Sequence, residues 1–194
     1  MLIGPAGAGK TTVGSLVAYA LGTDFVDADA QGDPYYAEVG WSIDRLTARI
    51  AAVGRAAAEQ EWEPARAHAV ARLVETGAGS VLALGAGHTS YTRDEHRATV
   101  RAALRSVPTV VLLLPDEDPG RALDVLRMRC RADKGTDWVR DGHDFLAAWL
   151  AEPEHRWLAT HVVTTATEAP GETAIRVAAL ARAQIVATDP ESTR

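Results

Sequence analysis

The sequence contains one cysteine, Cys130, and two lysines, Lys10 and Lys134, in a chain of 194 residues. A single cysteine cannot form a disulfide within the chain, which favours the reducing cytoplasm as its compartment. No apolar run approaches the roughly 18 residues that a membrane-spanning helix needs, and Val110–Leu114 has only the length of a strand. Basic residues number 20 against 26 acidic ones, and this deficit of positive charge argues against nucleic acid or anionic membranes as partners.

The remaining composition is typical of a globular protein, with 47% hydrophobic and 24% charged residues. At roughly 150 residues per domain, this length predicts one domain, which we place at residues 1–185 and expect to act as a monomer or homodimer. Residues 131–155 are polar and contain Gly135 and Gly142, so we expect them to form an irregular, mobile lid. We expect residues 186–194 to be a disordered tail.

Short apolar runs alternate with segments of helical periodicity along the chain. This alternation predicts an α/β fold with a parallel, roughly five-stranded sheet and helices on both of its faces. Pro64 is expected to begin or to kink a helix, because proline has no N–H to donate inside one. Ligands of such folds bind beyond the carboxyl ends of the strands. The expected strands are 1–3, 25–26, 80–84, 109–114 and 161–164, and the expected helices are 11–21, 42–55, 64–75, 94–106, 117–130 and 172–182.

The strongest motif is Gly4–Thr11, which matches G-x-x-x-x-G-K-[ST], follows a strand and opens an amphipathic helix. Its glycines let backbone N–H groups point at a phosphate, and the helix N-terminus adds partial positive charge. The motif predicts that Lys10 reaches the β- and γ-phosphates of ATP and that the Thr11 hydroxyl is a ligand of Mg²⁺. The residues expected to bind the nucleotide are Gly7, Ala8, Gly9, Lys10, Thr11 and Thr12.

A phosphate-binding loop does not by itself identify the reaction. A GTPase would carry an N-K-x-D segment, whereas the second lysine of this chain lies in the sequence DKGTD. A motor protein would carry a strand that ends in Asp-Glu, which Pro115–Glu117 after Val110–Leu114 imitates in part. A compact kinase that acts on a small molecule is therefore favoured.

Beyond this loop, the sequence resembles the shikimate kinase family at a series of short motifs. The resemblance begins at Phe25–Asp29, where a strand ends in Asp-Ala-Asp. Gly40–Ile43 resembles the G-x-S-I segment of that family, and Glu59–Trp62 resembles its E-x-x-F/W segment. Val81–Gly87 is similar to its strand that ends in three glycines. The resemblance implies a nucleoside-monophosphate-kinase-like fold with a lid that closes over ATP.

The resemblance also implies roles for individual residues. Asp27 resembles the carboxylate that holds Mg²⁺ through water, and Asp29 resembles the one that binds the accepting hydroxyl as base or orienter. Arg156 and Thr165–Pro170 resemble the substrate arginine and the adenine-contacting loop. Arginines of the lid are expected to stack on adenine and to offset charge in the transition state. We assign catalysis to Lys10, Asp29, Arg131 and Arg140, further nucleotide contacts to Arg127 and Pro170, and substrate contacts to Asp29, Trp62, Glu63, Arg66, Gly85, Ala86, Gly87, His88 and Arg156.

One departure from the family concerns the substrate. Where the family carries a carboxylate-binding arginine, this chain has Glu63, followed by Pro64, with an arginine only at Arg66. Two unit charges about 4 Å apart interact with a Coulomb energy of ~4 kcal/mol at an effective dielectric constant of roughly 20. A glutamate at this position would therefore repel an acidic substrate. We therefore expect a hydroxylated acceptor that carries an amine, such as an amino-sugar, bound by Glu61 or Glu63. The alternatives are shikimate kinase itself, with Arg66 or Arg156 as the substitute arginine, a nucleoside or nucleotide kinase, and a non-catalytic nucleotide-binding regulator.

Overall fold

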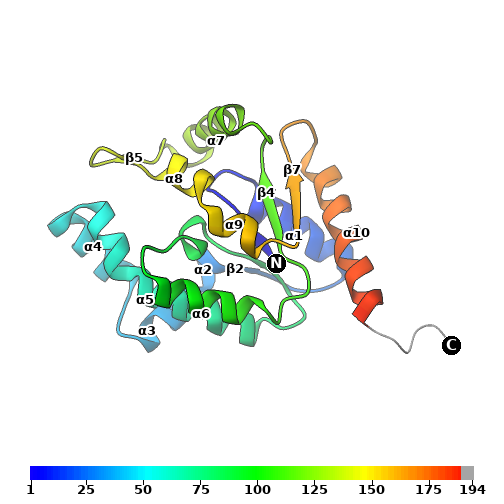
Figure 1. Ribbon diagram of the computed structural model, residues 1–194, viewed down its shortest axis with the longest axis horizontal. Helices are drawn as coiled ribbons and strands as arrows, with labels where there is room; N and C mark the ends of the chain where they lie inside the picture. The colour runs from blue at the N-terminus through cyan, green and yellow to red at the C-terminus, as the bar shows by residue number, and fades with distance from the viewer. Residues whose placement is uncertain (189–194) are drawn as a thin grey trace.

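Five parallel strands form the central sheet of the computed structural model, which describes residues 1–188 (Figure 1). The strands lie in the order β2-β3-β1-β4-β7, so the first strand of the chain occupies the middle of the sheet. Each strand of the sheet is joined to the next one along the chain by a helical connection, which confirms the α/β fold expected from the alternating pattern. The strands are β1 (Leu2–Ile3), β2 (Phe25–Asp27), β3 (Val81–Ala83), β4 (Val111–Leu114) and β7 (His161–Thr164).

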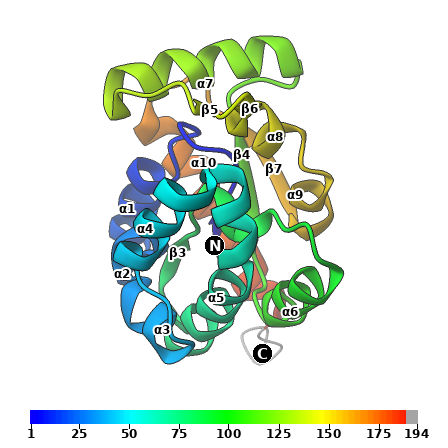
Figure 2. The same ribbon diagram turned by 90° about the vertical axis from the view of Figure 1, so that its left-hand side faces the viewer.

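Both faces of the sheet are buried, and side chains alternate between them. Leu113 packs with α1 (Lys10–Leu21) and α10 (Pro170–Thr188), while Leu112 packs with α5 (Arg55–Thr76) and α6 (Asp94–Leu104). Successive residues of a strand point to opposite faces, which explains why β4 is apolar throughout. Figures 1 and 2 show these helix pairs on the two sides of the sheet. Among the described residues, no helix is both long enough and apolar enough to cross a membrane.

The helix that contains Pro64 differs from the expectation. It begins at Arg55, directly after Gly54, and runs to Thr76 with Pro64 inside it, rather than beginning near residue 64. Proline removes one helical hydrogen bond, leaving the carbonyl four residues before it without a donor. Pro64 and Gln60 are both exposed, so water can bind that carbonyl. The preceding helix, α4 (Ile43–Val53), begins as predicted at Ser42, whose Oγ accepts a hydrogen bond from the backbone N–H of Arg45 at 3.1 Å.

Residues 131–155, called the lid segment from here on, are more regular than expected. They contain the end of α7 (Pro119–Lys134), the hairpin strands β5 (Val139–Arg140) and β6 (His143–Asp144), α8 (Phe145–Ala151) and the start of α9 (Pro153–Leu158). The N-terminus of α8 is capped by the Asp144 carboxylate, which accepts a hydrogen bond from the backbone N–H of Ala147 at 3.0 Å. The buried faces of Phe145, Leu146 and Trp149 then hold this short helix against the core.

Three short elements complete the fold: α2 (Ala28–Gln31), α3 (Asp33–Glu38) and the 3₁₀ turn η1 (Ala86–Thr89). The expected tail at 186–194 is partly wrong, because α10 continues to Thr188. The remaining residues of that tail, 189–194, lie outside the described residues.

Candidate active site

A cavity of about 580 Å³ lies beyond the carboxyl ends of β1, β2 and β3. Segments that follow each of these strands line it, which is the position expected for ligands of an open parallel sheet. Many of the residues singled out in the sequence are brought together there. Those that line the cavity are Gly7–Thr12, Asp27, Asp29, Trp62, Arg66, Ala86–His88 and Pro170.

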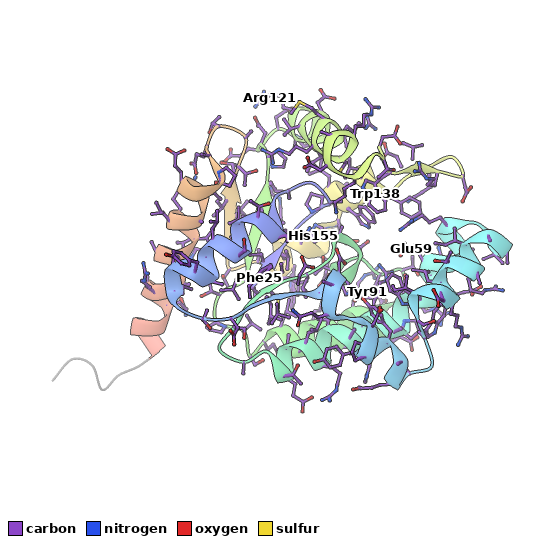
Figure 3. All side chains as sticks on the ribbon, turned by 180° about the vertical axis from the view of Figure 1, so that it is seen from behind. Phe25, Glu59, Tyr91, Arg121, Trp138 and His155 are labelled. Carbon is purple, nitrogen blue, oxygen red and sulfur yellow. The ribbon has the colours of Figure 1, made fainter. Side chains whose placement is uncertain are left out.

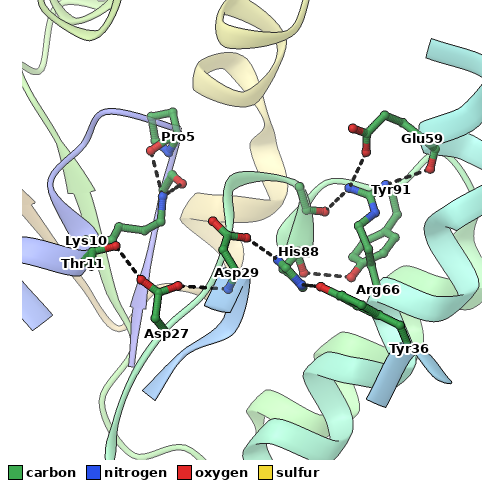
Figure 4. A network of polar contacts seen from close by, with 12 residues as sticks. Pro5, Lys10, Thr11, Asp27, Asp29, Tyr36, Glu59, Arg66, His88 and Tyr91 are labelled. Carbon is green, nitrogen blue, oxygen red and sulfur yellow. Dashed lines mark hydrogen bonds and ion pairs between the residues drawn. The ribbon is translucent and has the colours of Figure 1, made fainter. Parts of the chain in front are cut away.

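The loop before α1 has the backbone of a phosphate-binding turn. Gly9 immediately precedes the helix with φ 93°, a conformation that side-chain-bearing residues rarely adopt. The Lys10 ammonium donates hydrogen bonds to the backbone carbonyls of Gly4 at 2.8 Å and Pro5 at 2.9 Å (Figure 4). Burial lowers the pKa of Lys10 to about 8, an effect that the nearby Asp29 carboxylate opposes. Lys10 is therefore largely protonated at neutral pH and aimed along the loop.

Thr11 and Asp27 form the second part of the site. The Thr11 hydroxyl donates a hydrogen bond to Asp27 Oδ2 at 2.7 Å, and Asp27 Oδ1 accepts one from the backbone N–H of Asp29 at 2.9 Å. A hydroxyl and a carboxylate beside a phosphate-binding loop fit Mg²⁺, which is usually bound by one or two protein oxygens plus phosphate and water. Within residues 1–188 no group of three or more His, Cys, Asp or Glu gathers as a self-sufficient metal cage.

Asp29 lies between the phosphate-binding loop and α5 (Figure 4). Its side chain is 65% exposed, and its Oδ1 lies 3.8 Å from Nδ1 of the buried His88. The absent side chain of Gly85 makes room for this contact, since a Cβ there would lie 2.0 Å from Asp29 Oδ1. Gly85 therefore packs against the Asp29 side chain but does not line the cavity itself.

Four side chains of α5 line the cavity opposite the phosphate-binding loop: Arg55, Glu59, Trp62 and Arg66. Their spacing of four, three and four residues places them on one helical face. The Glu59 carboxylate lies between two guanidinium groups, 2.8 Å from Arg55 and 3.7 Å from Arg66. Arg66 is 4% exposed and also donates to the carbonyl of Gly87 at 2.5 Å. Two cations and one anion leave this face with net positive charge.

The lid segment and α7 close the nucleotide side of the cavity. Arg129 donates hydrogen bonds to the Thr165 hydroxyl at 3.2 Å and the Gly7 carbonyl at 3.4 Å, so it connects the phosphate-binding loop to the segment after β7. Lys134, at the end of α7, lines the cavity, and its charge lowers the pKa of Lys10. Figure 3 shows Trp138 of the lid segment on the same side of the molecule as Glu59, while Arg121 lies at the outer surface.

The arginines assigned to the lid in the sequence do not reach the cavity. Each is drawn to a carboxylate nearby in the chain: Arg131 and Arg140 to Asp137, at 3.5 and 3.8 Å, and Arg127 to Asp144. The cations that the structure brings to the cavity from this region are instead Arg129 and Lys134. Helical phase separates Arg129 from its neighbours two positions away, since residues i and i+2 do not share a face.

Glu63 and Arg156 also lie away from the cavity. Glu63 is 2% exposed, and its carboxylate accepts hydrogen bonds from the backbone N–H groups of Thr92 at 2.6 Å and Arg93 at 3.2 Å. Arg156 is exposed on α9. The neighbouring Glu61 pairs with Arg49 on the surface. Neither glutamate proposed as an amine partner therefore faces the ligand space.

Lys134 was missed in the sequence as a residue of the site, as was the charged pair of Arg55 and Glu59. Their signal was present, because 55, 59, 62 and 66 share one helical face. The expected helix start at Pro64 concealed it.

Comparison with known proteins places this geometry in a family. A sequence profile described as shikimate kinase matches residues 6–178. The shikimate kinase of Bradyrhizobium diazoefficiens is 30% identical over 154 residues, 79% of this chain and 64% of that protein. The shikimate kinase of Marinomonas sp. is 33% identical over 103 residues, 52% of this chain and 50% of that protein. The chain thus spans between about half and just under two thirds of the length of these curated relatives.

Among solved structures, a shikimate kinase from Acinetobacter baumannii in complex with shikimate has the same fold. Its TM-score to this chain is 0.63 at 22% identity, and the match covers 94% of this chain and 91% of that chain.

Proposed function

The chain belongs to the shikimate kinase family, and on that premise we propose that it is a cytoplasmic kinase that transfers the γ-phosphoryl group of ATP to a hydroxyl of a small acceptor. Residues 1–185 act as one kinase domain, and the lid segment closes over the nucleotide. The observation that carries the proposal is the continuity of one cavity, which holds Lys10 and Thr11, the carboxylate of Asp29 and the charged face of α5.

On the nucleotide side, Lys10 and the N–H groups of Gly7–Thr12 bind the phosphates. The hydroxyl of Thr11 and, through water, the carboxylate of Asp27 would hold Mg²⁺, which when bound neutralises charge on the β- and γ-phosphates. Pro170 borders the base. Arg129 and Lys134 take the role that the sequence assigned to Arg127, Arg131 and Arg140. Lys134 makes no hydrogen bond or ion pair with the described residues, so its ammonium is available to the transferring phosphoryl group.

On the acceptor side, Asp29 binds the hydroxyl that is to be phosphorylated. The paired guanidiniums of Arg55 and Arg66 surround one carboxylate, and their net positive charge suits an acceptor that carries a carboxylate of its own. Shikimate is such a molecule, and we propose it as the acceptor. The amine-bearing acceptor loses its basis, because Glu61 and Glu63 do not line the cavity.

The test is release of ADP from MgATP with and without shikimate, with Lys10→Ala as the blank. Release that depends on shikimate and is abolished in the blank would support the proposal. The methyl ester of shikimate, which lacks the negative charge, should then have a higher KM as acceptor than shikimate itself. Equal release with and without shikimate would exclude this acceptor. Binding of ATP with no transfer to shikimate or to other hydroxylated metabolites would favour a nucleotide-binding regulator.

A further inference from the structure

A buried imidazole stands directly behind the exposed carboxylate of Asp29. His88 is 2% exposed and Tyr36 is 1% exposed. The Tyr36 hydroxyl and His88 Nε2 are hydrogen-bonded at 2.8 Å, and Nδ1 on the other edge of the ring faces Asp29 Oδ1 at 3.8 Å (Figure 4). These three side chains therefore form a line from the core to the cavity, contributed by α3, η1 and α2.

Neighbouring residues hold the side chains of Tyr36, His88 and Asp29 in this arrangement. The ring of Tyr36 packs edge-on against Trp62, with centroids 5.0 Å apart. A Cβ at Gly85 would lie 2.6 Å from His88 Nδ1 and 2.0 Å from Asp29 Oδ1, so this glycine is required for their approach. Among the described residues, His88 is the side chain that lies at ion-pair distance from the Asp29 carboxylate.

The partners also determine where the protons lie. Burial, followed by the Asp29 charge, raises the pKa of Tyr36, so its hydroxyl keeps its proton. Burial lowers the pKa of His88 to about 4, with Arg66 and Lys10 acting in the same direction, and with Asp29 and a hydrogen bond to the Gly85 backbone acting against it. His88 is thus neutral at pH 7. A Tyr36 hydroxyl that donates to Nε2 places the single ring proton on Nδ1, the nitrogen that faces Asp29.

We propose that Tyr36 and His88 are positioning residues for Asp29: the Tyr36 hydroxyl fixes the ring proton of His88 on Nδ1, and this N–H orients the Asp29 carboxylate toward the accepting hydroxyl. At 3.8 Å the Nδ1–Oδ1 contact is longer than a hydrogen bond, and rotation of the exposed carboxylate shortens it when the acceptor binds. The inference rests on the proposed function, in which Asp29 holds that hydroxyl.

The first test needs no acceptor. Long-range ¹H–¹⁵N spectra of the ¹⁵N-labelled protein at pH 7 distinguish the two neutral tautomers of a histidine, and His88→Asn identifies the signals of His88. We expect the proton on Nδ1 in the wild type and a mixture of tautomers in Tyr36→Phe. Tyr91→Phe is the matched control, because its hydroxyl donates to the backbone carbonyl of His88 at 2.9 Å and not to the ring. A proton on Nε2 in the wild type would overturn the proposal.

The second test is kinetic. Asparagine keeps an N–H donor near the position of Nδ1, whereas leucine has none. Because misplacement by about 1 Å can cost roughly 10²-fold, we expect His88→Leu to lower kcat for shikimate by about 10- to 100-fold. We expect His88→Asn to retain most of it, with KM for MgATP unchanged in both variants. Equal losses in His88→Leu and His88→Asn, or an equal loss in Tyr91→Phe and Tyr36→Phe, would contradict a positioning role.

The two tests separate this inference from the proposed function. If shikimate is not phosphorylated, the acceptor proposed above is wrong, and the tautomer of His88 still decides whether Tyr36 sets its proton. If shikimate is phosphorylated and the tautomer is insensitive to Tyr36→Phe, the kinase proposal stands and the positioning role fails.

Discussion

Replacing Glu63 by glutamine separates a structural role of this residue from a role in substrate binding. Its buried carboxylate accepts hydrogen bonds from the backbone N–H groups of Thr92 and Arg93. These groups lie at the start of α6, whose N-cap residue Arg93 provides no side-chain cap of its own. Glu63 therefore binds, from a neighbouring helix, the two backbone N–H groups that immediately precede the first turn of α6.

The magnitude follows from these two contacts. Glutamine keeps one acceptor oxygen and turns an NH₂ group toward the second N–H, so one charge-assisted hydrogen bond is lost. Hydrogen bonds to charged groups contribute about 1.5–3 kcal/mol, so Glu63→Gln should lower the free energy of unfolding by about 2 kcal/mol. A domain of this size loses roughly 2–4 °C in Tm per kcal/mol, which gives a decrease of about 4–8 °C.

The assay is thermal or urea unfolding of Glu63→Gln beside Glu61→Gln, together with kcat/KM for the acceptor. Glu61→Gln is the matched control, because it makes the same change two residues away, in an exposed ion pair with Arg49. We expect Tm to decrease in Glu63→Gln alone and kcat/KM to stay within about twofold of wild type in both. An unchanged Tm together with a large change in kcat/KM would refute the reasoning and return Glu63 to the substrate site.

Three further predictions concern the cavity and its surroundings. Lys134→Ala should lower kcat by about tenfold or more with little change in KM for MgATP, because it removes positive charge from the transition state, whereas Arg121→Ala on the outer face of α7 should not. Gly85→Ala has an ordinary backbone conformation, with φ −61°, but its Cβ would displace Asp29. Its kcat should therefore decrease by about 10²-fold, while ATP binding measured by calorimetry is unchanged. Burial lowers the pKa of His155 to about 4, so below its usual pKa near 6.5 the unfolded chain binds a proton that the folded chain does not. His155 should then contribute ~1.4 kcal/mol per pH unit to a decrease in the free energy of unfolding between about pH 6.5 and pH 4, beside a similar contribution from His88, and urea titrations of His155→Gln should show a shallower decrease.

The sheet and the phosphate-binding loop were predictable because their signals are local. Apolar strand segments and the spacing of Gly4–Thr11 depend on neighbouring residues alone. The Asp-Ala-Asp segment at the end of β2 was equally readable, since side chains that follow adjacent parallel strands meet at one edge of the sheet.

The charged face of α5 was not predicted, and the reason is Pro64. Taken as a helix start, this proline divides the stripe of Arg55, Glu59, Trp62 and Arg66 between two elements. Whether a proline interrupts a helix depends on whether the carbonyl it leaves without a donor can be hydrated, and that depends on which side of the helix faces the core. The sequence carries the spacing of this stripe but not the tertiary burial that keeps the helix continuous.

The lid cations show a second limit. The sequence contains several arginines near the lid, and local composition does not show which of them reaches the cavity. Arg129 does so, whereas Arg127, Arg131 and Arg140 do not. The difference comes from Asp137 and Asp144, which form ion pairs with the other three arginines once the hairpin has formed. A cation becomes available for catalysis partly because the neighbouring carboxylates are paired with other residues, which is a property of the folded lid segment.

One carboxylate connects the two halves of the proposed reaction. Asp27 binds the Thr11 hydroxyl with one oxygen and the backbone N–H of Asp29 with the other, so it fixes the separation between the phosphate side and the acceptor side. In-line transfer requires that separation to be held within a fraction of an ångström. Replacing Asp27 by asparagine would keep one of these contacts and disturb the other, whereas a change at Asp29 would leave the spacing intact and remove only the group that meets the acceptor. In the proposed reaction the two aspartates are thus two residues apart in sequence and distinct in role, the first setting the geometry of transfer and the second engaging the hydroxyl.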